Sequence, residues 1–243
     1  MALLVDKKLS MSSYSGASFL GIAGICGIIF WSCALAYGGF VGPEVPLHVL
    51  WVPSQWFHVL SAAFGVYGTI WIGRHSNEAT LRTSVLCNQL GIIGIYLTIL
   101  GQMCFFTDGV IALVVFPPFA ETYPDTTKVT GILFTGSNGV AYVVFCVSYM
   151  IGHLVLGTAL LWARDKSYPV PVVALMMIGA VFANLPPYVP FGLIGCGGLL
   201  WGIAASVLAI IHLVRLRQEF QDISSILGSG APDIVNDKLD QQP

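Results

Sequence analysis

Six long apolar segments without a charged residue constrain the fold of this chain more than any other feature of its sequence. They cover residues 17–37, 52–73, 84–106, 139–163, 170–186 and 191–214. A helix of about 20 apolar residues crosses the hydrocarbon core of a bilayer, and a helix satisfies its own backbone hydrogen bonds there. We therefore predict an all-α, polytopic integral membrane protein, a bundle of six transmembrane helices.

The composition excludes most soluble functions. Hydrophobic residues make up 56% of the 243 residues and charged residues only 9%, against about 25% charged in an average soluble domain. The mean hydropathy is +0.82. A net charge of −2 offers no basic surface to nucleic acid. The lipid bilayer is thus the first partner that the sequence predicts.

The basic residues predict the orientation of the bundle. If the N-terminus is cytoplasmic, nine of the ten lysines and arginines fall on the inner side and only Lys128 falls outside. The positive-inside rule then places both termini in the cytoplasm, in a plasma membrane or a bacterial inner membrane. A cleavable signal peptide ending near residues 34–36 is the less favoured alternative, because the apolar run is long for one.

The segments outside the spans are predicted from their polarity and length. Residues 1–16 form a cytoplasmic N-terminal segment that precedes the transmembrane domain of residues 17–214. The apolar stretch 107–119 is too short to span, so it is interfacial or re-entrant. Residues 215–228 are predicted to form a short cytoplasmic amphipathic helix. Residues 229–243 are polar and are predicted to be a disordered tail.

Glycine-rich faces indicate close helix packing. Gly21 and Gly24 lie on the first span, and Gly198 and Gly202 form a Gly-x-x-x-Gly pair on the sixth. Small residues let membrane helices approach closely, where lipid supplies no hydrophobic drive between them. We favour packing within one chain. The alternative is a contact with another membrane subunit or with a second copy of this chain.

Four polar residues form an outer layer near the predicted outer surface. His58, Gln102, Asn138 and Asn184 all lie within about two helical turns of that surface. They are candidate ligand-binding residues for a neutral or weakly polar molecule. The simpler interpretation, which we favour, is that they cap helix ends and hydrogen-bond between helices.

A second, inner layer of polar residues is the candidate for a haem or quinone site. It holds Asn88, Gln89, Tyr149, His153 and His212. His153 lies eleven positions before Arg164 and His212 three before Arg215, so the two imidazoles differ in depth by about 10 Å. That excludes a haem held by both, but not one held by His153, His58 or His212 alone. The favoured interpretation is a hydrogen-bonded His153.

Catalytic and metal-binding patterns are missing from the sequence. No charged residue lies within the six segments, Asp108 being the nearest, just beyond the third. This argues against ion-coupled transport and against retinal binding. The Gly-x-Ser-x-Gly, P-loop and dinucleotide motifs are absent. All six cysteines lie in spans without a Cys-x-x-Cys pair. We predict no catalytic residue and no metal site.

The functional prediction is accordingly broad. We expect a non-enzymatic membrane component, either an accessory or assembly subunit or a binder of a small neutral or apolar ligand. One alternative is a haem- or quinone-binding anchor of an electron-transfer complex. Another is a facilitator of neutral-solute transport that uses the outer polar layer.

Overall fold

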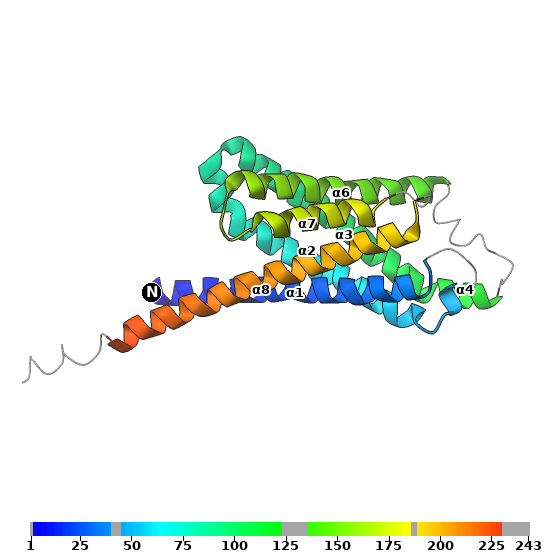
Figure 1. Ribbon diagram of the computed structural model, residues 1–243, viewed down its shortest axis with the longest axis horizontal. Coiled ribbons are helices and arrows are strands. Elements are labelled where there is room, and N and C mark those ends of the chain that lie inside the picture. The colour runs from blue at the N-terminus through cyan, green and yellow to red at the C-terminus, as the bar shows by residue number, and fades with distance from the viewer. Residues whose placement is uncertain (1, 40–44, 123–135, 186–188, 230–243) are drawn as a thin grey trace, which may run out of the picture.

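The computed structural model describes residues 2–39, 45–122, 136–185 and 189–229, and this part of the chain is all-helical, as predicted (Figure 1). Its six long helices are α1 (Ala2–Ala36), α2 (Trp51–Thr83), α3 (Val85–Val114), α6 (Gly136–Ala163), α7 (Val170–Ala183) and α8 (Phe191–Ser229). Two short helices accompany them, η1 (Val45–Leu47) and α4 (Phe116–Thr122).

Several helices are long and apolar enough to cross a membrane. Within the described residues these stretches are Ser13–Ala36, Val85–Thr122, Tyr142–Ala163 and Phe191–Asp222. The helix α7 is apolar but only 14 residues long, and α2 carries Arg74, Glu78 and Arg82 in its last third. Four apolar helices of this kind support integration into a membrane.

The long helices run roughly along one common axis (Figure 1), and their contacts close a ring. Going round the ring, α1 packs on α2, α2 on α3, α3 on α6, α6 on α7, α7 on α8, and α8 again on α1. The short α4 packs beside η1 at one end of the bundle, at the right in Figure 1. We call it the cavity end. The opposite end, the arginine end, carries Arg74, Arg82, Arg164, Arg215 and Arg217.

At three places a helix of the structure runs across a predicted segment boundary. The helix α3 runs to Val114, and α4 follows at once, so residues 107–119 are not a separate re-entrant segment. The segment 215–228, predicted as a separate short helix, is the unbroken continuation of α8, since no Gly or Pro occurs in it before Gly228. The helix α1 already begins at Ala2, inside the predicted N-terminal segment. Residues 230–243 lie outside the described residues.

The connection between α2 and α3 is also shorter than the predicted spans suggest. Residues 74–83, which lie between the second and third predicted spans, are helical, and Ser84 alone separates the two helices. Its hydroxyl accepts a hydrogen bond from the Cys87 backbone N–H at 3.0 Å, so Ser84 is the N-cap of α3.

The predicted glycine faces lie in the contact between α1 and α8. A Cβ placed on Gly24 would lie 2.6 Å from the Gly202 carbonyl oxygen, and one on Gly202 would lie 2.8 Å from the Gly24 carbonyl oxygen. Gly21 packs against Ala209, and Gly198 against the ring of Trp31. These glycines pack the two helices within one chain, so a subunit that binds this protein has to use another face.

Candidate functional site

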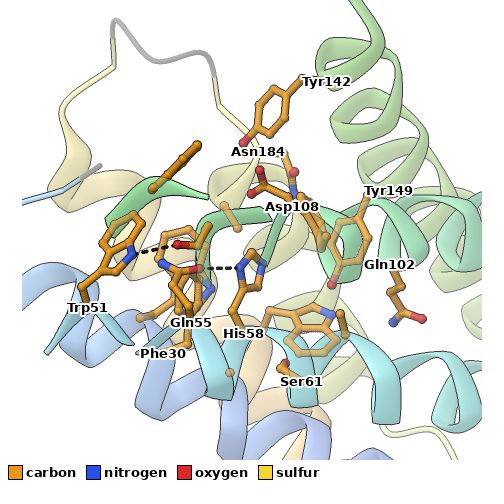
Figure 2. A pocket seen from close by; sticks show the side chains of 18 residues that line it. Phe30, Trp51, Gln55, His58, Ser61, Gln102, Asp108, Tyr142, Tyr149 and Asn184 are labelled. Carbon is orange, nitrogen blue, oxygen red and sulfur yellow. Dashed lines mark hydrogen bonds between the residues drawn. The ribbon is translucent and has the colours of Figure 1, made fainter. Parts of the chain in front are cut away.

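A cavity of about 110 Å³ lies inside the cavity end of the bundle (Figure 2). Aromatic side chains make most of its wall: Phe30, Trp31, Trp51, Phe105, Phe116, Tyr142, Tyr149 and Trp201. Its polar lining consists of Gln55, His58, Ser61, Gln102, Asp108 and Asn184. The small residues Gly27, Ala62, Ala112 and Ala183 leave the space open. An apolar cavity with a few converging polar groups is the usual form of a small-molecule site.

Trp51, the first residue of α2, connects the helices around the side of the cavity nearest to α4. Its indole N–H donates to the Ala112 carbonyl oxygen on α3 at 3.0 Å. Its ring lies 5.8 Å from the ring of Tyr37 and 6.2 Å from the ring of Phe116. Trp51, at 2% exposure, thereby links α1, α2, α3 and α4 above the cavity.

His58 is fixed in the wall by stacking. Its ring lies parallel to that of Phe30, with 4.2 Å between centroids and 9° between planes. Its Nδ1 lies 3.4 Å from the Gln55 Oε1 one helical turn earlier, and Figure 2 draws this contact. His58 and Gln55 thus present a connected polar pair on one side of an otherwise aromatic space.

The floor of the cavity is a buried polar network under Tyr149 and Trp201. The Trp201 indole N–H donates to His153 Nε2 at 2.9 Å. The Nδ1 of His153 lies 3.0 Å from the Tyr149 carbonyl oxygen. Since Nε2 accepts, Nδ1 carries the proton and donates, and the imidazole is the neutral Nδ1–H tautomer. Both ring nitrogens of His153 are therefore occupied.

Gln102 completes the floor. It is 2% exposed, and its Oε1 accepts a hydrogen bond from the Thr69 hydroxyl at 3.3 Å. Its amide nitrogen lies where a side chain on Gly65 would begin, 2.8 Å from a Cβ placed there. The glycine in α2 is thus what leaves room for the amide in α3.

Three of the four predicted outer-layer residues meet at this cavity. His58, Gln102 and Asn184 all line it, and the side chain of Asn138 lies outside the described part. Asn184 also bonds back to the end of α7, its Nδ2 donating to the Ala180 carbonyl oxygen at 2.8 Å. Asn184 therefore both caps the end of α7 and lines the cavity.

The inner layer, by contrast, is not one site. Tyr149 lines the cavity and His153 lies beneath it. Asn88 accepts a hydrogen bond from the Thr80 hydroxyl at 2.9 Å, joining α3 to α2. Gln89 is exposed on the outside of the bundle. His212 belongs to a separate aromatic cluster at the arginine end.

That cluster joins α2, α8 and the turn before α7. The His212 ring lies 4.7 Å from Trp71, 4.8 Å from His75 and 5.2 Å from Tyr168, centroid to centroid. The Nδ1 of His75 lies 3.2 Å from the Tyr168 hydroxyl. Burial lowers the pKa of His75, opposed by the nearby Asp165 and Glu219 and reinforced by Arg215. The described histidines, cysteines and carboxylates form no group of three that fits a metal ion.

Sequence analysis missed the polar lining residues Gln55, Ser61 and Asp108 and, apart from Tyr149, the aromatic wall. The prediction placed Asp108 beyond the third span, but α3 continues past it, and the apolar stretch Val85–Thr122 contains it. Asp108 lies outside the predicted segment 84–106 but inside the longer apolar stretch of the structure. The available signal was the apolar run 109–116 after Asp108, which continues the helix.

Comparison with known proteins adds no assignment. The chain matches no protein-family model, no curated protein and no solved structure. Its function therefore has to be argued from the cavity itself.

Proposed function

We propose that this chain is a six-span membrane protein that binds a small, largely apolar ligand. The binding site is the aromatic cavity described above. The observation that carries the proposal is the cavity itself, with eight aromatic side chains in its wall. Aromatic walls give a small ligand large contact areas at low entropic cost. The polar groups set its orientation.

The arrangement of the polar groups favours binding over catalysis. Ser61 donates its hydroxyl to the Ala23 carbonyl oxygen at 2.8 Å, and the Trp51 N–H is bonded to Ala112. The Ser61 hydroxyl is therefore not placed as a nucleophile next to a general base, which covalent catalysis requires. His58, Gln55 and Asn184 keep polar atoms toward the cavity and serve as hydrogen-bond partners for the ligand.

The packing below the cavity favours a binding site over a channel. Leu156, Leu160 and Leu208 are each at most 1% exposed and fill the bundle between the floor and the arginine end. Interiors packed in this way leave no path for a solute. We therefore place facilitated transport behind ligand binding. A haem held by His153 also ranks lower, because a haem iron would displace the Trp201 hydrogen bond from Nε2.

The proposed orientation follows from charge. The arginine end is assigned to the cytoplasm by the positive-inside rule, and α2 and α7 complete the six spans. The cavity then lies near the outer surface and takes its ligand from the outside.

Equilibrium dialysis tests the proposal. The full chain in lipid nanodiscs is dialysed against deuterated 2-phenylethanol, a neutral aromatic probe, beside empty nanodiscs. We expect saturable binding of one probe per chain. Ala183→Trp fills the cavity and should abolish it, whereas Ala36→Trp, on an exposed position of α1, should not. Uptake equal to that of empty nanodiscs, or unaffected by Ala183→Trp, contradicts the proposal.

A further inference from the structure

One charged residue lines the described cavity, and it has no compensating charge there. The carboxyl group of Asp108 belongs to the lining, and no lysine or arginine is among the lining residues that the structure describes. Figure 2 draws its carboxylate among the side chains of Tyr142, Asn184 and His58. Asp108 makes no hydrogen bond and no ion pair with another described residue.

The described ionisable neighbours of Asp108 are neutral groups. The Tyr142 phenol and the thiols of Cys104 and Cys146 interact with it electrostatically. Phenols and thiols in an apolar environment are uncharged at neutral pH. The Nδ1 of His58 lies 3.4 Å from the Gln55 Oε1 and its ring stacks on Phe30, so neither contact joins His58 to Asp108. Within the described residues, the Asp108 carboxylate thus faces an aromatic space without a cation.

Asp108 is half-buried, and an unpaired carboxylate that is partly removed from water in an apolar cavity is costly unless a partner compensates it. Aromatic faces attract cations through the ring quadrupole, most strongly for Trp. The cavity places three tryptophans, Trp31, Trp51 and Trp201, around the same space as Asp108. The carboxylate and the ring faces select the same property of a ligand, a positive charge on an organic body.

Resting on the proposed ligand-binding function, we infer that the ligand is a small organic ammonium ion, held by an ion pair to Asp108 and by the faces of the surrounding aromatic rings. The ammonium group donates to the carboxylate, and the carbonyl oxygen of Gln55 or Asn184 is a second acceptor within the same lining. The apolar body of the ligand lies over Tyr149 and Trp201 at the floor.

The test compares a charged probe with its neutral analogue. 2-Phenylethylamine and 2-phenylethanol differ in the ammonium group and have nearly the same shape. Dialysis against the full chain in nanodiscs of zwitterionic lipid should give the amine about tenfold or more tighter binding than the alcohol, as expected for a charge-assisted hydrogen bond. Asp108→Asn should remove that advantage and leave alcohol binding within about twofold.

The matched control is Glu121→Gln, which makes the same change in net charge on an exposed residue of α4 at the same end. It should leave both affinities unchanged. Equal binding of the two probes, or an amine advantage that survives Asp108→Asn, overturns the inference while leaving the proposed function intact. If neither probe binds saturably, the proposed function fails.

Lys128 lies in residues 123–135, outside the described part. The variant Lys128→Met tests the alternative that Lys128, and not the ligand, neutralises Asp108. If Lys128 neutralises Asp108, the wild type prefers neither probe, which contradicts the inference, and the amine advantage arises only in Lys128→Met. If the ligand's ammonium group is the partner, the wild type already prefers the amine.

Discussion

The two ends of the bundle hold similar residue types in opposite arrangements. At the arginine end, His75, His212, Trp71 and Tyr168 pack their rings on one another and fill the space between α2, α8 and the turn before α7. At the cavity end, histidine, tryptophan and tyrosine side chains surround a cavity of about 110 Å³. Aromatic and polar residues near a helix end thus either fill the space between the helices or line a cavity.

The first and largest expected effect concerns the close contact of α1 and α8, which supports both ends. Gly24→Leu introduces a side chain against the Gly202 backbone, 2.6 Å from its carbonyl oxygen. Because backbone cannot yield, overpacking here should cost about 3 kcal/mol or more, and little folded protein should be recovered by gel filtration in mild detergent. Gly192→Leu, which meets nothing within 4 Å, is the control and should express normally.

The second prediction compares the loss of stability caused by a substitution in the packed core with the loss caused by one in the cavity. Leu156→Ala, at a position 1% exposed, should cost about 2–5 kcal/mol because it creates a void in a filled core. Ala183→Trp adds far more volume but enters existing space, so it should cost less than about 1 kcal/mol. Unfolding by SDS titration from mild detergent measures both. A larger cost for Ala183→Trp than for Leu156→Ala would show that the cavity is not open space.

The third prediction addresses the floor of the cavity. His153→Phe removes the acceptor of the buried Trp201 N–H and should cost about 1–3 kcal/mol. His153→Gln restores an acceptor and should recover part of that loss. SDS titrations of the two variants measure the loss of unfolding free energy in each. Equal losses would mean that the hydrogen bond contributes nothing to stability.

The smallest expected effect lies at the arginine end and depends on pH. Burial lowers the pKa of His75 in the folded protein, so the unfolded chain binds its proton more readily. Stability should therefore fall slightly as the pH drops from 7.5 through about 6.5, the ordinary histidine value. His75→Gln should flatten this slope in SDS titrations at several pH values. A steeper slope in the variant would contradict the assignment.

Much of the helical architecture follows from the apolar runs alone, because a chain in lipid has to satisfy its backbone internally. The positions of the helix ends cannot be derived from the apolar runs. Ser84 is the whole connection between α2 and α3, and a rule that ends helices at the membrane surface cannot anticipate amphipathic extensions. The continuation of α3 past Asp108 was missed for the same reason.

The candidate site was partly predictable. Depth along a helix follows from the rise per residue, which grouped His58, Gln102 and Asn184 in one layer, and all three line the cavity. Rotation about the helix axis does not follow from depth. Gln89 and Asn88 share one depth, yet one is exposed and the other bonds to Thr80. The cavity depends on the same rotations, which is why its aromatic wall was not identified.

The most direct test of the binding cavity is fluorine NMR of the protein labelled with 5-fluorotryptophan. Of the six tryptophans, Trp31, Trp51 and Trp201 line the cavity, whereas Trp56, Trp71 and Trp162 do not. Titration with 2-phenylethylamine should shift the first three resonances saturably and leave the other three in place. Shifts in none of them, or equal shifts in all six, would contradict a ligand site at the cavity end.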